Sequence, residues 1–224
     1  MKVIIHAGTH KTGTTSIQHA LRRNRDLLEE SGVHYPLFAP CTSTHHRFAH
    51  GLTGADPDAL RQAEGFARAA LDRAGPMARV LVISAEPIYR HINGLNGWDD
   101  YGEAPDYWPR RVAYLQRLAG LFEGHETEVL LVFRDRAAFA RSLRHELAKK
   151  QIWTGTEADF LRVFYALLDY ERQLEAFRAT FPVVTVLSYE ACMEEDGSVL
   201  SAFFRAIGTT LPPRAQGIWE NASG

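Results

Sequence analysis

Near the start of the chain stands the run Val3-Ile4-Ile5-His6-Ala7-Gly8-Thr9-His10-Lys11-Thr12-Gly13-Thr14-Thr15-Ser16. Its apolar first half predicts a buried strand, its two glycines a tight loop, and its hydroxyl-rich end the first turn of a helix. Gly8 and Gly13 tolerate backbone angles that other residues resist, so the loop can fold around a ligand. Unpaired N–H groups and the positive end of the helix dipole favour an anion there, and Lys11 adds a full positive charge. The run therefore predicts a site for a phosphate-like group; a turn that merely links strand to helix is the alternative.

The order of residues separates this loop from the triphosphate-binding loop of nucleotide triphosphatases. That loop reads G-x-x-x-x-G-K-[ST], with its lysine after the second glycine. Here Lys11 precedes Gly13, and Gly8 lies only five residues before Gly13. The run from Gly8 to Gln18 instead resembles the 5′-phosphosulfate loop of the sulfotransferases, especially the bacterial version G-x-H-K-T-G-T-T-S-I-Q. The resemblance implies that the sulfuryl donor is bound by Gly8, His10, Lys11, Thr12, Gly13, Thr14, Thr15 and Ser16.

A second strand-to-helix junction follows the apolar residues 129–133 and begins at Arg134. A guanidinium group can bind a phosphate with two hydrogen bonds, and Ser142, eight residues later on the predicted helix, can donate its hydroxyl to the same anion. Sulfotransferases have an arginine and a serine at this spacing to hold the 3′-phosphate of 3′-phosphoadenosine 5′-phosphosulfate (PAPS). The resemblance therefore assigns Arg134 and Ser142 to the donor, although Arg136 stands where the family often has proline.

A late strand over residues 182–190 ends in Tyr189 and Glu190. This ending resembles the strand end whose tyrosine approaches the adenine ring in sulfotransferases. The resemblance makes Tyr189 a candidate donor contact, with a core tyrosine at a strand end as the alternative.

The strand predicted for residues 80–83 leads to Glu86. Ligands of open α/β sheets bind beyond the carboxyl ends of the strands, so Glu86 should lie beside Lys11 if the two strands are neighbours. Its Ser-Ala-Glu context resembles the strand-end glutamate of carbohydrate-type sulfotransferases. Glu86 is therefore the first choice for the base that takes the proton of the acceptor. A structural role, capping the following segment, is the alternative.

A histidine cluster between His45 and His50 offers a second choice of base. Other branches of the family use histidine, which makes His46, with His45, a catalytic candidate beside Lys11 and Glu86. His46 and His50 are four residues apart and could share one face of a helix, but no third ligand has a recognisable metal-site spacing. We therefore predict no metal site, and a pocket-lining role or an ordinary surface loop is equally compatible with the cluster.

The remaining chain alternates helical and strand patterns. Helical spacing covers residues 17–28, 57–74, 109–122, 157–180 and 199–207, and a short edge strand is predicted at 33–36. Residues 37–56 and 93–108 are predicted to be irregular, and the aromatic residues of the second segment would form an acceptor-binding wall or anchor the loop to the core. With the resemblance, these elements imply one domain over residues 1–224 with an α/β fold, a P-loop-like three-layer sandwich around a mostly parallel sheet. The tail 212–224 shows no packed pattern, and Arg214, Trp219 and Asn221 are candidates for a segment that closes over the nucleotide.

Composition excludes several classes of protein. The 25 lysines and arginines nearly balance 27 aspartates and glutamates, which argues against nucleic-acid binding by bulk charge. Two cysteines are too few for a disulfide framework or a cysteine-based zinc site. We see no signal peptide and no apolar run long enough to span a membrane, which predicts a cytoplasmic protein.

The resemblance implies a PAPS-dependent sulfotransferase that needs no metal and leaves 3′-phosphoadenosine 5′-phosphate as product. Its acceptor would be a hydroxyl or amine of a small metabolite or glycan, and the sequence does not specify an oligomeric state. Two other classes of protein stay open. One is a small-molecule kinase or NTPase, in which the strand before Glu86 would hold magnesium. The other is a catalytically silent nucleotide-binding module.

Overall fold

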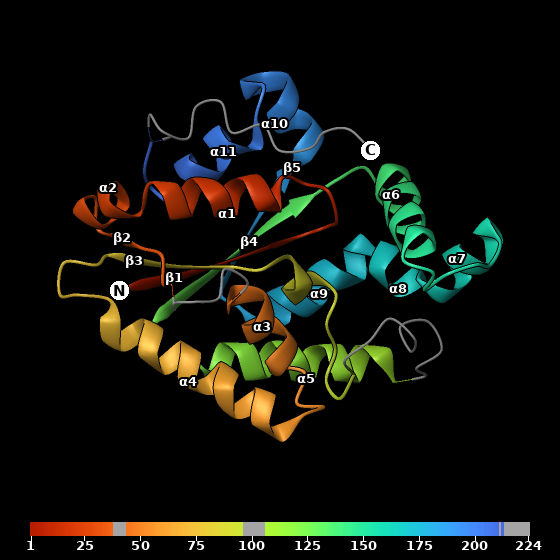
Figure 1. Cartoon of the computed structure of the whole chain (residues 1–224), viewed down its shortest axis with the longest axis horizontal. Helices are drawn as coiled ribbons and strands as arrows, with labels where there is room; N and C mark the ends of the chain where they lie inside the picture. The colour runs from red at the N-terminus through yellow and green to blue at the C-terminus, as the bar shows by residue number, and fades with distance from the viewer. Residues whose placement is uncertain (38–43, 96–105, 211, 213–224) are drawn as a thin grey trace.

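A five-stranded parallel sheet runs through the described part of the chain, which in the computed structural model comprises residues 1–37, 44–95, 106–210 and 212 (Figure 1). Its strands are β1 (Lys2–Gly8), β2 (Val33–His34), β3 (Val80–Ser84), β4 (Glu126–Phe133) and β5 (Val183–Ser188). They lie in the order β2-β3-β1-β4-β5, and each neighbouring pair is parallel. The inner strands are nearly continuous apolar runs because helices cover both faces of the sheet.

One face of the sheet is covered by helices from the two ends of the chain, namely α1 (Thr14–Arg23), α2 (Arg25–Glu30), α10 (Tyr189–Asp196) and α11 (Val199–Ala206) (Figure 1). Ile17 of α1 and Phe203 of α11 pack in one buried cluster with Ile4 of β1 and Leu130 of β4. Alternate residues of the same strands face the other way, as the two-residue period of a strand requires.

The opposite face is covered by α3 (Thr44–Gly51), α4 (Pro57–Arg73), α5 (Tyr107–Gly120) and α9 (Tyr170–Thr180). Ile5 of β1 packs there in a second buried cluster with Phe48, Leu115 and Phe177. Three further helices, α6 (Arg136–Lys149), α7 (Glu157–Val163) and α8 (Tyr165–Leu168), follow the carboxyl end of β4, at the right of Figure 1. The fold is thus the predicted α/β three-layer sandwich with a central parallel sheet.

The order of the strands determines which residues meet. β1 lies between β3 and β4, with His6 opposite Ser84 and Gly8 opposite Val132. The chain visits β2 and β3 on one side of β1 and then crosses to β4 on the other side, so β1 lies at the point where the strand order reverses. The loop after β1 consequently lies between the ends of β3 and β4, where open α/β sheets bind their ligands.

Two of the predicted helices differ from the observed ones. The helix predicted for residues 17–28 is interrupted at Asn24, whose side-chain amide donates to the carbonyl of Ala20 at 2.8 Å. The single helix predicted for residues 157–180 is wrong, because it is divided into α7, α8 and α9. The last break comes at Asp169, whose carboxylate accepts from the N–H of Arg172 and starts α9. Because the apolar face continues across both breaks, the spacing of apolar residues in the sequence does not reveal them.

Two segments have more helix than expected. Residues 44–51, within the segment predicted to be irregular, form α3. Tyr189 begins α10 instead of ending a strand, and α10 itself was not predicted. Most of the predicted aromatic loop (96–105), the tail candidates Arg214, Trp219 and Asn221, and Cys41 lie outside the described residues. None of the helices in the described ranges has the length and apolarity that crossing a membrane requires.

Candidate functional site

The loop between β1 and α1 has two residues with a left-handed backbone, separated by Thr12. Gly13, the residue before α1, has φ +77°, and Lys11 has φ +61°, a conformation that non-glycine residues rarely adopt. No side chain of the described residues caps α1. The backbone N–H groups at the start of this helix are therefore available to an anion, together with the Lys11 ammonium.

Hydrogen bonds tie the loop to the end of β4. The buried hydroxyl of Thr12 donates to the carbonyl of Thr9 at 2.8 Å, and the N–H of Thr9 donates to the carbonyl of Val132 at 3.0 Å. The hydroxyl of Thr9 accepts from the N–H of Arg134 at 3.0 Å, and the Tyr170 hydroxyl donates to the carbonyl of Arg134 at 3.0 Å. The loop and Arg134 are thus parts of one rigid unit.

Glycine is needed at the two glycine positions of the loop for different structural reasons. Gly13 needs its positive φ, and a Cβ there would also lie 2.7 Å from Val199. Gly8 does not have a left-handed backbone, so the expectation of unusual angles is wrong at this position. A Cβ at Gly8 would lie only 2.7 Å from the carbonyl oxygen of Val132, so glycine is required by the close approach of β1 to β4.

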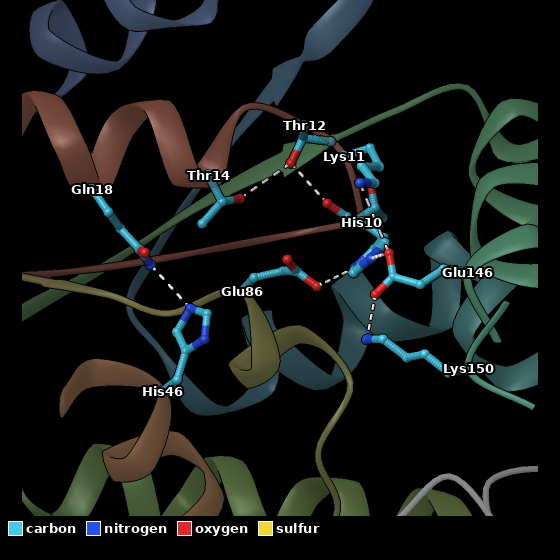
Figure 2. A network of polar contacts seen from close by, with 10 residues as sticks. His10, Lys11, Thr12, Thr14, Gln18, His46, Glu86, Glu146 and Lys150 are labelled. Carbon is cyan, nitrogen blue, oxygen red and sulfur yellow. Dashed lines mark hydrogen bonds and ion pairs between the residues drawn. The ribbon is translucent and has the colours of Figure 1, made fainter. Parts of the chain in front are cut away.

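His10 lies between two carboxylates at the mouth of the loop (Figure 2). Its Nδ1 is 2.5 Å from Oε1 of Glu86, and its Nε2 is hydrogen-bonded to Oε2 of Glu146 on α6. The predicted proximity of Glu86 to the loop is therefore observed, because β1 and β3 are neighbours. The partner of Glu86 is His10, and Glu146 had not been expected at the site.

Two lysines complete this polar network. Nζ of Lys150 is 2.7 Å from Oε1 of Glu146, and Nζ of the half-exposed Lys11 is 4.0 Å from Oε2 of the same carboxylate. Burial would raise the pKa of Glu146, but hydrogen bonds from Lys150 and His10 outweigh it and lower the pKa to about 2. Glu146 is therefore ionised at neutral pH.

The charge of His10 follows from the same contacts. Burial opposes a charged imidazole, but the hydrogen bonds and negative charges of Glu86 and Glu146 outweigh it and raise the pKa of His10 above its ordinary value of 6.5. His10 is the basic side chain closest to Glu86 in this network.

Arg134 lies beyond β4 and close to Tyr189 of α10. The guanidinium carbon is 5.8 Å from the centre of the Tyr189 ring, and Asp135 donates its N–H to the carboxylate of Glu190 at 3.0 Å. The buried Nε of Arg134 has no hydrogen-bond partner among the described residues. Such an unpaired buried donor is costly unless a ligand satisfies it.

Ser142 and Glu146 stand four residues apart on α6 and so share one face of the helix. No hydrogen bond joins Ser142 to Arg134 in the described part of the chain. Ser142 therefore lies on the helix face that meets the loop, without a hydrogen bond to Arg134.

The two histidines proposed as bases are both engaged. His46 of α3 accepts on Nε2 from the side-chain amide of Gln18 at 3.2 Å, and burial lowers its pKa. His45 is buried, with Nδ1 accepting from the N–H of Ser84 at 3.2 Å and Nε2 donating to the carbonyl of Pro36 at 2.8 Å. Both ring nitrogens of His45 are thus occupied by backbone groups, and its role is to join α3 to β3.

A narrow recess of about 10 Å³ opens beside the His10–Glu86 pair, room for about one water-sized group. Its walls include Gly8, His10, Glu86, Arg90 and Leu143. A larger cavity of about 490 Å³ lies at the β2 edge of the sheet and contains none of the predicted site residues. Within the described ranges, no three His, Cys, Asp or Glu side chains are grouped as a metal site.

Sequence reasoning missed Glu146, Gln18 and Tyr170. Gln18 belongs to the resembling run but was given no role, although its amide also donates to the carbonyl of Ser84 at 2.9 Å. Glu146 had one available signal, its position one helical turn after Ser142. Tyr170 had none, because its contact with Arg134 joins residues 36 positions apart.

Comparison with solved structures places this fold among known ones, whereas no protein-family model and no curated protein sequence matches the chain. The crystal structure of a sulfotransferase from Alicyclobacillus acidocaldarius superposes with a TM-score of 0.51 and 15% identity, covering 93% of this chain and 81% of that chain. The sulfotransferase domain from the curacin biosynthetic pathway superposes with a TM-score of 0.53 and 10% identity, covering 98% and 77%. At such identities the likeness is one of architecture. The chain has the fold seen in these two sulfotransferases.

Proposed function

We propose that this chain is a sulfotransferase that moves a sulfuryl group from PAPS to a hydroxyl or amine of a small molecule or glycan. The observation that carries the proposal is the hydrogen-bonded unit formed by the Lys11 loop and Arg134. It brings two cationic groups that could each bind an anion to the ends of the neighbouring strands β1 and β4. The shared fold with two sulfotransferases supports it. We also propose that residues 1–224 act as one domain.

The residues present suit the donor. The uncapped start of α1, with Thr14, Thr15 and Ser16 and the ammonium of Lys11, would hold the 5′-phosphosulfate. The unpaired buried Nε of Arg134 supports binding of the 3′-phosphate there, beside the ring of Tyr189. Ser142 would be a second donor to that phosphate. When bound, the donor supplies an activated sulfuryl group on a good leaving group.

Lys11 would stabilise the negative charge that grows on the bridging oxygen as its bond to sulfur breaks. Preorganised donors at such a position are worth about 3–4 kcal/mol in comparable sites. The acceptor oxygen forms the new bond to sulfur, and the electron pair of the broken bond stays with the departing phosphate. The proton of the acceptor goes to Glu86, at the wall of a recess that admits one small group. His46 is the weaker choice of base, because its Nε2 already accepts from Gln18.

Thermal unfolding tests the donor assignment. We expect 3′-phosphoadenosine 5′-phosphate to raise the midpoint without magnesium, since ligands that bind only the folded state stabilise it. Stabilisation by ATP with magnesium alone would contradict the proposal and indicate a kinase or NTPase. Incubation with labelled PAPS and a cell extract then identifies the acceptor. Tight nucleotide binding without any labelled product would indicate a silent nucleotide-binding module.

A further inference from the structure

We propose that Glu146 is a positioning residue that keeps His10 protonated on both ring nitrogens beside Glu86. The catalytic consequence rests on the proposed function, but the protonation of His10 is a property of the protein alone. Neither residue had been assigned this role, since His10 was expected only to contact the donor.

The hydrogen-bond inventory of the three groups leads to this inference. Each ring nitrogen of His10 meets a carboxylate oxygen, Oε1 of Glu86 at 2.5 Å and Oε2 of Glu146. An ionised carboxylate can only accept, and a neutral imidazole has only one N–H. Both contacts are satisfied together when His10 is an imidazolium, donating from both nitrogens. A neutral His10 would point a lone pair at one of the two carboxylates.

The charges around His10 come from three parts of the chain. Glu86 and Arg90 come from η1 (Glu86–Tyr89) and the residue after it. Glu146 and Lys150 come from α6 and the residue after it, and Lys11 comes from the loop itself. Lys150 binds the oxygen of Glu146 that His10 does not use. Lys150 thereby keeps Glu146 ionised, and Glu146 keeps its second oxygen directed at His10.

This arrangement answers a difficulty that any anionic donor creates for a carboxylate base. A donor bound at the loop would bring negative charge towards the carboxylate of Glu86, and the two like charges would repel each other. An imidazolium 2.5 Å from Glu86 opposes that effect. Glu146 acts through His10, and its contribution is the charge of the imidazole next to the base.

The direct test is a pH titration of the ring nitrogens of His10 by NMR, assigned by the signals lost in His10→Gln. In the wild-type protein we expect both nitrogens to be protonated in more than half of the molecules at pH 6.5, because the pKa of His10 is raised above that value. Glu146→Gln keeps the shape of the side chain and removes its charge, and should lower the pKa of His10 by about one unit or more. The matched control is Glu175→Gln, which removes an exposed carboxylate of α9 and should leave the titration unchanged.

A neutral His10 in the wild-type protein at pH 6.5, or equal titrations in Glu146→Gln and Glu175→Gln, would overturn the proposal. The wild-type measurement decides the matter even where Glu146→Gln fails to fold. Turnover gives the second readout: the alkaline limb of the kcat profile should move to lower pH in Glu146→Gln, with the KM for PAPS little changed. A protein that shows the expected titration but transfers no sulfuryl group would contradict the proposed function and leave the role of Glu146 in charging His10 intact.

Discussion

Lys11 shows how one residue can serve a site at a local cost in backbone energy. It adopts a left-handed conformation at φ +61°, and its ammonium is half-exposed and 4.0 Å from Glu146. For a residue with a Cβ this conformation costs about 1–2 kcal/mol. The geometry points to a lysine placed for a ligand, since a glycine would fit the turn better.

Two substitutions at Lys11 separate these effects. Lys11→Ala and Lys11→Gly should both reduce kcat/KM for sulfuryl transfer by about 10²- to 10³-fold, because both remove the ammonium. Lys11→Gly should be more stable than Lys11→Ala by about 1 kcal/mol in urea unfolding, because only glycine relieves the left-handed turn. Lys149→Ala is the control, since that lysine is exposed at the end of α6 and the lysines labelled in the network of Figure 2 are Lys11 and Lys150. Equal turnover in Lys11→Ala and Lys149→Ala would contradict the assignment.

Arg134 is expected to affect donor binding more than folding. Arg134→Gln should weaken binding of 3′-phosphoadenosine 5′-phosphate by about 10- to 100-fold, since a hydrogen bond to a charged group is worth about 1.5–3 kcal/mol. Isothermal titration calorimetry measures the change. Arg136→Gln is the matched control, because Arg136 makes an exposed ion pair with Glu171 instead. Similar affinities in the two variants would place the 3′-phosphate elsewhere.

Acid titration tests the ionised state of Glu146. Its pKa is lowered to about 2, so its interactions stabilise the fold above the ordinary pKa of 4.5 and are lost as the pH falls towards 2. The free energy of unfolding of wild type should therefore exceed that of Glu146→Gln most clearly near pH 5–6, and the difference should shrink between about pH 4.5 and 2. Urea unfolding over this range measures it. A difference that does not depend on pH would show that Glu146 contributes by packing and not by charge.

At the scale of elements, His45 is one of the residues that attach α3 to the sheet. Its two backbone hydrogen bonds join β3 to the segment after β2, and its ring stacks on Tyr35 with centroids 4.5 Å apart. The neighbouring His46 faces Gln18 of α1 instead. The adjacent histidines of α3 thus have different hydrogen-bond partners, and the sequence pattern does not distinguish them.

This division of roles predicts different effects of two alanine substitutions. His45→Ala should destabilise the protein by about 2–4 kcal/mol, because it leaves buried backbone groups unpaired and empties a stacked site. His46→Ala should cost less, because the pKa-lowered ring is only partly buried and has one side-chain partner. Urea unfolding of both variants measures the difference. A stable His45→Ala variant that loses only activity would instead make His45 a base.

Residues that are consecutive in the sequence were easier to predict than helix ends and contacts between distant elements. The loop after β1 could be predicted because its glycines, lysine and hydroxyl residues are consecutive, and the Glu86 position followed once β1 and β3 proved to be neighbours. Helix ends were harder, since the break at Asp169 depends on a cap within an unbroken apolar face. Glu146 had only its spacing from Ser142 as a signal, and its contact with His10 depends on the packing of α6 beside the loop.

For the whole molecule, the strand order is what assembles the site. His10, Glu86 and Glu146 are distant in sequence and meet beside the end of β1, and Arg134 is joined to the same loop through Thr9, because β1 lies between β3 and β4. Arg111 of α5 is wholly buried and donates to the carbonyls of Ile88 and His91 at 2.8 and 2.7 Å. These hydrogen bonds hold η1, which begins at Glu86, and the residues after it. The fold class was predicted from the alternating patterns together with the family resemblance, but this convergence is a property of the tertiary structure.

The hydrogen bond between the hydroxyl of Thr9 and the N–H of Arg134 has a consequence for selectivity. It holds the backbone of Arg134 beside the Lys11 loop, and under the proposed function it thereby sets the spacing between the groups that bind the 3′-phosphate and the 5′-phosphosulfate. Adenosine 5′-phosphosulfate, which lacks the 3′-phosphate, would then contact the Lys11 loop but not Arg134. Discrimination between the two nucleotides would then come from the contact of the 3′-phosphate with Arg134, whose backbone is held at a set place beside the Lys11 loop.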